Sequence, residues 1–358
     1  MVEQIDHKSY VVISDGKRER EEYRRLILRR MLFSILCIAL IIMLFGVSLS
    51  LGSAQISFIE AYSAIFGKFF PDYFRTDPLA HTVVWHLRLP RTLMAVLCGV
   101  ILAVAGCTTI AVLKNPLTTP YTLGVSAGAG FGAAIAIILS KGLFEGFLIV
   151  GNAFVLSLVP IIVILLFSKK ANIGPESIIL MGVAMSYIFS ACNTLLQFIA
   201  EAEAVRMTVF WLIGDLARAS WWQIPYATSV LVLSLFVTMK LAPDINIMKM
   251  GDEQAKALGV DVRRVRRISL LVVCLSTATV VSFTGAIGFI CLLSSHICRL
   301  IVGGDERYLI PISGLFGAVL LLTSDIIARR IVAPIMLPVG AVTALMGGPL
   351  LIYLLIKR

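Results

Sequence analysis

MGDEQAKALGVDVRRVRR, residues 250–267, is the only long internal segment rich in charge in a chain that is otherwise mostly apolar. Its residues 253–258 are strong helix formers, and Gly259 follows at the position of a helix C-cap. Asp252 is placed to cap the N-terminus of that helix, where its negative charge also suits the helix dipole. The segment therefore predicts a short exposed helix at about 250–260, followed by a basic cluster of Arg263, Arg264, Arg266 and Arg267.

The composition around this segment is that of a membrane protein. Of 358 residues, 59% are hydrophobic and only 15% are charged, and the mean hydropathy is +0.95. Soluble domains carry about 25% charged residues. The net charge of +10 does not indicate a nucleic-acid partner, because the basic residues lie mainly at the ends of apolar runs, as the positive-inside rule expects. We therefore expect a lipid bilayer around the chain and no nucleic acid.

The apolar runs divide into predicted membrane spans. One run, 268–302, has 35 residues and is too long for a single span of roughly 20 residues, and the pair Gly285 and Gly288 offers a break within it. The predicted spans are residues 31–51, 92–113, 121–140, 146–168, 177–200, 219–239, 268–285, 288–302, 308–327 and 338–356. The fold class is therefore an all-α polytopic membrane protein with about ten transmembrane helices.

Charge placement orients these spans. Residues 1–30 form a polar tail that ends in four arginines, and residues 31–358 form the transmembrane domain. An even number of spans puts both termini in the cytoplasm, together with the basic loops at 114, 169–170 and 249–267. Residues 56–70 are predicted to form an amphipathic helix on the outer surface, and 201–218 a polar outer segment.

Polar side chains inside the fifth predicted span form a stripe on one helical face: Ser186, Ser190, Asn193 and Gln197. Polar groups at membrane depth must face protein or water. Two interpretations stay open: a stripe that lines a substrate pathway, and a stripe that forms hydrogen bonds between helices.

Two further patterns have a structural and a functional interpretation. Gly124, Gly128 and Gly132 recur every four residues in the third span, a spacing that lets helix backbones approach closely. Asp325 and Arg329 are four residues apart near the outer end of the ninth span, where they can form an ion pair, or Arg329 can instead point outward to an acidic partner.

The chain shows no motif of an enzyme or of a metal site. It has no G-x-x-x-x-G-K-[ST], no H-E-x-x-H and no G-x-S-x-G, so we expect no catalytic residue, and no ATP bound in a P-loop of this chain. The seven cysteines form no CxxC pair, and Cys291, His296 and Cys298 do not converge on one face of a helix. We therefore expect no metal site.

Several stretches together resemble the permease subunits of bacterial and archaeal ABC importers for iron-siderophores, haem and cobalamin. They are LRLPRTLMAVLCGVILAVAG (87–106), KNPLTTPYTLGVSAGAGFGAA (114–134), WLIGDLARASW (211–221), GDEQAKALGVDVRRVR (251–266), GFICLLSSHICRLIVGGDERYLIP (288–311) and ARRIVAPIMLPVGAVTALMGGPLLIYLL (328–355). The resemblance covers about 55–357. The chain departs from the family pattern at Asp215, where Ser is usual, at Cys291, where Gly is usual, and at Ser295, where Pro is usual.

The resemblance implies a type II importer in the cytoplasmic membrane. Its expected partners are a second permease subunit, in a homodimer or a heterodimer, an ABC ATPase subunit and an extracytoplasmic substrate-binding protein. This chain would bind no cofactor, and ATP and Mg would lie on the partner ATPase. The alternative is an ion-coupled secondary transporter without an ATPase, for which Asp325 is the only candidate coupling residue.

The resemblance also implies roles for particular residues. The segment of Gly251, Asp252, Glu253, Ala255, Leu258 and Gly259 would be the coupling helix that enters a cleft of the ATPase. Arg88, Arg91 and Arg329 match positions where the family presents arginines outward to acidic residues of the binding protein. The stripe of the fifth span corresponds to the family's pathway-lining helix, which favours the pathway interpretation.

Overall fold

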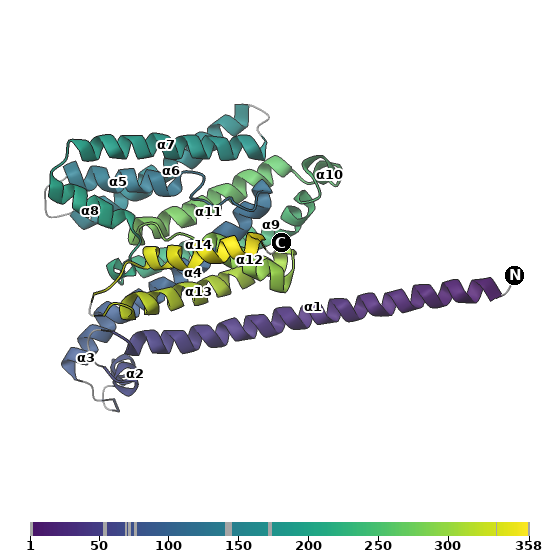
Figure 1. The fold of residues 1–358 in the computed structure, drawn as a ribbon, viewed down its shortest axis with the longest axis horizontal. Coiled ribbons are helices and arrows are strands. Elements are labelled where there is room, and N and C mark those ends of the chain that lie inside the picture. Colours follow the sequence, from purple (N-terminus) through teal and green to yellow (C-terminus); the bar gives the residue numbers. More distant parts are fainter. Residues whose placement is uncertain are drawn as a thin grey trace.

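The structure is a computed structural model that describes residues 3–52, 56–68, 70, 73–74, 77–139, 145–170, 174–333 and 335–356. These residues form helices joined by short loops (Figure 1). The helices are α1 (Glu3–Ser50), α2 (Phe58–Gly67), α3 (Pro78–Val83), the π-helical turn η1 (Val84–Arg88), α4 (Leu89–Leu113), α5 (Val125–Leu139), α6 (Glu145–Lys170), α7 (Pro175–Phe198), α8 (Ala202–Leu212), the 3₁₀ turn η2 (Leu216–Arg218), α9 (Gln223–Met248), α10 (Asp252–Ala257), α11 (Val262–Thr284), α12 (Ile290–Val302), α13 (Glu306–Arg330) and α14 (Val339–Ile356).

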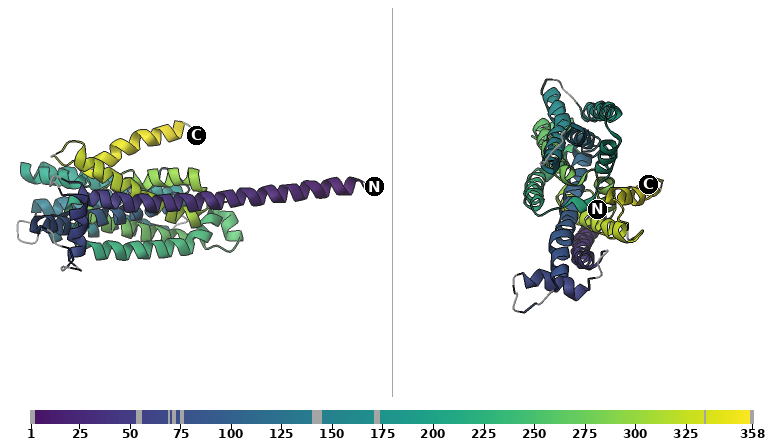
Figure 2. Two further views of the ribbon diagram at one scale, coloured as in Figure 1. Left: turned by 90° about the horizontal axis from the view of Figure 1, so that it is seen from below. Right: turned by 90° about the vertical axis from the view of Figure 1, so that its left-hand side faces the viewer.

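The predicted all-α, multi-pass architecture is confirmed. Within the described ranges, seven helices are long and apolar enough to cross a membrane, and shorter apolar helices coincide with the third, eighth and tenth predicted spans. The number of helices that cross a bilayer and the side on which the termini lie stay predictions. In Figures 1 and 2, α10 and the ends of the chain lie toward one end of the bundle, whereas α2, α3 and α8 lie toward the other.

Several predicted boundaries differ from the structure. The third span was expected from residue 121, but α5 begins only at Val125, because Lys114 (φ 53°) ends α4 and Gly124 (φ 94°) holds the connecting loop in a left-handed conformation. Ser140, its predicted end, lies outside the described residues. The 201–218 segment, expected as a polar stretch, contains the helix α8, which buries Thr208 and Trp211. The polar tail is continuous with the first span in α1.

Helix α4 is the centre of the bundle and packs against α9, α11, α12 and α13. Small residues allow this packing. Gly99 on α4 and Gly317 on α13 face each other so closely that a Cβ atom on either would collide with the other helix, and Gly106 meets the backbone of Cys291 on α12 in the same way. Close backbone approach through small residues is the usual way in which membrane helices associate.

The glycines of the third span serve the same purpose, as their spacing predicted. Gly128 and Gly132 on α5 lie against the carbonyl groups of Leu156 and Asn152 on α6. Gly124 lies just before α5 and contacts Pro160 of the same neighbouring helix. The structural interpretation of this pattern is therefore confirmed for Gly128 and Gly132, whereas Gly124 serves the turn before α5.

The long apolar run breaks between α11 and α12, as predicted. Gly285 (φ 75°) and Phe289 (φ 66°) both have left-handed backbone conformations. The break is joined to the loop after α8, because the Gly214 amide donates to the Ala286 carbonyl (3.1 Å). That loop is joined in turn to α14, because the Gly340 amide donates to the Gly214 carbonyl (2.8 Å). These bonds hold the loop after α8, the α11–α12 break and the start of α14 next to one another.

Candidate functional site

Helix α10 is the predicted exposed helix, bounded by glycines with positive φ. Gly251 (φ 137°) precedes it and Gly259 (φ 86°) follows its last turn. Ala255 is buried against the bundle, whereas the Leu258 side chain is 62% exposed and the Glu253 side chain 84%. Leu258 and Glu253 therefore present an apolar and an acidic side chain on the surface of the protein.

Asp252 does not cap α10, in contrast to the prediction. The N-cap residue is Gly251, and Asp252 occupies the first turn, where its carboxylate is engaged by two cations. Lys114 Nζ lies 2.6 Å from Asp252 Oδ1, and Arg266 Nη2 lies 2.7 Å from Oδ2. Burial alone would raise the pKa of Asp252, but the hydrogen bonds from Lys114 and Arg266 outweigh it and lower the pKa below its ordinary value.

These two cations fasten α10 to the transmembrane bundle. Lys114 follows α4 directly, and the buried Arg266 belongs to α11 and donates to the Val112 carbonyl at 3.4 Å. Sequence reasoning placed Arg266 in a basic cluster and Lys114 at a turn, but it gave neither a partner, because Lys114 and Asp252 are 138 positions apart. Asp252 thus connects α10 to the end of α4 and to α11.

A second polar network lies at the same end of the bundle, between α9 and α13. Asn246 donates to Asp305 Oδ1 (2.7 Å) and accepts from the Glu306 amide (2.9 Å). The fully buried Glu306 pairs with Lys249 and with Arg299 (3.3 Å). The hydrogen bond from Arg307 is the main cause that lowers the pKa of Asp305 to about 2. This network fixes the loop that follows α12.

The predicted pathway stripe lies on α7. Ser190 is exposed, and Ser186, Asn193 and Gln197 are half-buried. Ser186 donates to the Gly182 carbonyl of its own helix at 3.0 Å, not to another helix. Asn193 Oδ1 is buried without a hydrogen-bond partner among the described residues. The pathway interpretation stays a prediction.

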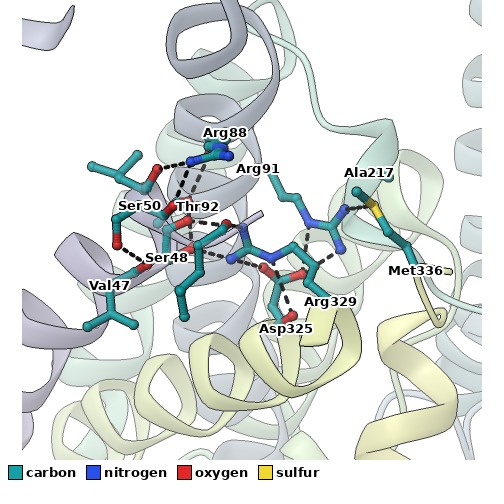
Figure 3. Close-up of polar contacts among 12 residues, drawn as sticks. Val47, Ser48, Ser50, Arg88, Arg91, Thr92, Ala217, Asp325, Arg329 and Met336 are labelled. Carbon is teal, nitrogen blue, oxygen red and sulfur yellow. Dashed lines mark hydrogen bonds and ion pairs between the residues drawn. The ribbon is translucent and has the colours of Figure 1, made fainter. Parts of the chain in front are cut away.

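The arginines expected to face outward lie inside the fold instead (Figure 3). Asp325 on α13 is fully buried between two of them. Arg91 Nε and Nη2 lie 2.9 and 2.8 Å from Asp325 Oδ1, and Arg329 Nη2 lies 2.9 Å from Oδ2, an ion-pair contact without hydrogen-bond geometry. The predicted pair of Asp325 and Arg329 is therefore present, and Arg91 joins it.

Arg88 and Arg329 also contact the last carbonyl groups of α1. Arg88 Nη1 donates to the carbonyls of Leu49 and Ser50 at 2.8 Å, and Arg329 Nη1 to those of Ser48 (3.0 Å) and Leu51 (2.9 Å). The last carbonyls of a helix lack partners within it, so the two arginines supply the missing donors. Arg88 and Arg329 are buried with these carbonyls as acceptors, whereas Arg91 is buried beside Asp325, and the role of all three arginines in binding-protein docking stays a prediction.

Two of the three departures from the family pattern, Cys291 and Ser295, are buried, and Asp215 is partly exposed. Asp215 Oδ1 lies 4.0 Å from Arg91 Nη2, so it adds a second, partly exposed carboxylate beside the buried cluster. Cys291 is buried in the core, and Ser295 donates to the Cys291 carbonyl at 2.7 Å. Within the part of the chain that the structure describes, no three His, Cys, Asp or Glu side chains are grouped as metal ligands.

Comparison with known proteins agrees with this architecture. The chain matches the FecCD transport family over residues 11–357. It is 40% identical to an ABC transporter permease protein of Methanocaldococcus jannaschii, over 94% of this chain and 97% of that protein. It is 32% identical to the hemin transport system permease protein HmuU of Yersinia pestis, over 92% and 96%.

A solved structure shows the same fold. An ABC transporter of the metal-chelate type, in an inward-facing conformation, matches with a TM-score of 0.79 and 27% identity, covering 91% of this chain and 99% of that one. The family match spans nearly the whole chain, and the ordered sequence blocks, the multi-pass helical fold and the exposed helix α10 agree with it. The chain therefore belongs to the FecCD transport family and is a multi-pass membrane permease of the ABC importer type.

Proposed function

We propose that this permease carries a bulky metal chelate, of the iron-siderophore, haem or cobalamin kind, inward across the cytoplasmic membrane. A separate ATPase subunit would bind and hydrolyse ATP with Mg, and this chain would bind no cofactor itself. A second permease subunit would complete the pathway, to which α7 would contribute Ser186, Ser190, Asn193 and Gln197. An extracytoplasmic binding protein would deliver the substrate to the end of the bundle opposite α10.

The observation that carries this proposal is that α10 exposes side chains to a partner and is also ion-paired to the transmembrane helices. The helix offers Glu253 and Leu258 to a partner, while Asp252 is held by Lys114 and Arg266. A surface that only bound a partner would need the exposed side chains alone. The ion pairs to the ends of α4 and α11 supply a mechanical connection through which an ATPase can move the spans.

The test replaces the exposed face of α10. The chain is co-expressed with its ATPase and reconstituted in proteoliposomes with its binding protein. Glu253→Arg and Leu258→Trp are compared there with Glu22→Arg, which changes an exposed acid on the N-terminal part of α1. We expect uptake to fall at least about tenfold in the α10 variants, because changes at the centre of an interface usually cost that much or more in binding. The thermal stability of these variants should be normal. Normal uptake in both α10 variants would refute the coupling role.

An ion-coupled transporter without an ATPase is disfavoured. Such a mechanism needs an ionisable group that can release its ion during transport. Asp325, the only candidate in the sequence, is held between Arg91 and Arg329. The relatives reported above are permeases and transporters of the ABC class, which agrees with an ATP-driven mechanism.

A further inference from the structure

An open groove separates α6 from α11 at the ends of these helices that lie nearest α10. Its volume is about 300 Å³. Five apolar residues line it, Ile162, Leu165 and Leu166 from α6 and Ile268 and Leu271 from α11, together with Arg264 and Arg267. The Ile162, Leu166 and Leu271 side chains are 49%, 58% and 44% exposed. The groove is therefore an apolar channel on the flank of two membrane spans, with two cations at one end of it.

In the described part of the chain, neither Arg264 nor Arg267 forms an ion pair with a carboxylate. The two carboxylates that share a cavity with Arg267 are Asp252, which is paired with Lys114 and Arg266, and Glu253, which is paired with Lys256. Asp261, the N-cap residue of α11, accepts from the Arg264 backbone amide at 3.0 Å. Arg267 Nε reaches only the Arg263 carbonyl, at 3.3 Å. Both arginines lie in the first two turns of α11, where the helix dipole adds positive potential.

We propose that this groove binds an anionic phospholipid, with an acyl chain between α6 and α11 and the headgroup phosphate between Arg264 and Arg267. The apolar walls belong to two helices that are long and apolar enough to cross a bilayer, and in a bilayer the exposed walls of such helices would face acyl chains. The arginines lie where those spans end, which is the level of the headgroups. Basic pockets between membrane helices on the cytoplasmic side are suited to anionic lipid headgroups.

The neighbouring cavity gives such a lipid a structural consequence. That cavity has a volume of about 240 Å³, shares Leu165 and Arg267 with the groove, and reaches Asp252 and Arg266 of the α10 anchor. A lipid phosphate at Arg267 therefore lies beside the ion pairs that connect α10 to the bundle. A free phosphate ion would use the arginines and leave the apolar walls uncovered, so the groove favours the lipid.

The test measures lipid binding to the purified full chain in detergent by native mass spectrometry. Phosphatidylglycerol and phosphatidylcholine with identical acyl chains are titrated. The variants are Arg264→Gln with Arg267→Gln, and Leu271→Trp, which fills the groove without a change of charge. The matched controls are Arg263→Gln, which removes a neighbouring charge that does not line the groove, and Leu180→Trp on the exposed side of α7.

We expect phosphatidylglycerol to bind more tightly than phosphatidylcholine. Each groove arginine should contribute about fivefold, so the double variant should bind roughly 30-fold more weakly, and Leu271→Trp should also weaken binding. Both controls should bind as the natural chain does. Equal affinity for the two lipids, equal weakening by Arg263→Gln, or full competition by inorganic phosphate would overturn the proposal. If the double arginine variant does not fold, the lipid affinities of Leu271→Trp and Leu180→Trp are compared instead, and equal affinities would overturn the proposal.

Discussion

Asp325→Asn should be among the most destabilising single changes in this protein. The carboxylate is fully buried and neutralises two arginines, with three nitrogen–oxygen distances of 2.8 to 2.9 Å. An amide of the same shape leaves the buried Arg329 without a carboxylate and leaves Arg91 with only the partly exposed Asp215, at 4.0 Å. Removal of one partner from a buried ion pair costs about 3–5 kcal/mol. We therefore expect the free energy of unfolding to fall by about that amount.

The assay is unfolding of the purified chain in detergent, followed by helical circular dichroism against denaturant and temperature. The matched control is Glu203→Gln, because Glu203 forms an exposed pair with Arg206 at 3.4 Å and exposed pairs contribute little. A double-mutant cycle with Arg91→Met should show a favourable coupling energy between Arg91 and Asp325. An Asp325→Asn protein as stable as the Glu203→Gln control would show that the buried cluster carries no net stabilisation, and the reasoning would fail.

Two further changes test helix packing and the cytoplasmic network. Gly128→Val forces α5 away from the Leu156 carbonyl of α6 and should lower the free energy of unfolding by about 1–3 kcal/mol. The control Gly151→Val, with open space around it, should change that free energy little. Equal thermal unfolding midpoints for the two variants would contradict the packing. Because the pKa of Asp305 is lowered to about 2, its stabilising charge is fully present above its ordinary pKa of 3.8 and is lost as the pH falls toward 2. Asp305→Asn, which keeps a good helix cap, should therefore flatten the pH dependence of the unfolding midpoint in that range, and an unchanged profile would argue against it.

The elements that sequence reasoning found are those set by local chemistry. The run 268–302 is too long for one span, and Gly285 supplies the positive φ that its break needs. Helix α10 follows from strong helix formers before Gly259. Helix α8 was missed because the charged residues spread over 201–218 pointed to a connecting segment, although apolar residues predominate there, and Glu203 in the first turn with Arg206 three residues later is a helical signal.

The partners of the charged residues could not be predicted in the same way. Arg91 and Asp325 are 234 positions apart, and the acceptors of Arg88 are backbone carbonyls, which leave no mark in a sequence. The family pattern gave these arginines an outward direction, whereas the unsatisfied end of α1 and the charge of Asp325 draw them inward. The sequence thus indicated which residues matter at this end of the bundle but not what they contact.

The end of α1 carries a consequence for how the protein is made. Its Ser48 carbonyl accepts a hydrogen bond from Arg329, which lies 281 residues later in the chain. At about 5–20 residues per second, the ribosome adds that arginine roughly a quarter of a minute to one minute after it has passed Ser48. The first span to enter the membrane is therefore completed by one of the last, and a chain interrupted before α13 holds an α1 whose final carbonyls lack those donors. The hydrogen bonds from Arg329 at the end of the first helix therefore form only after nearly the whole chain has been synthesised.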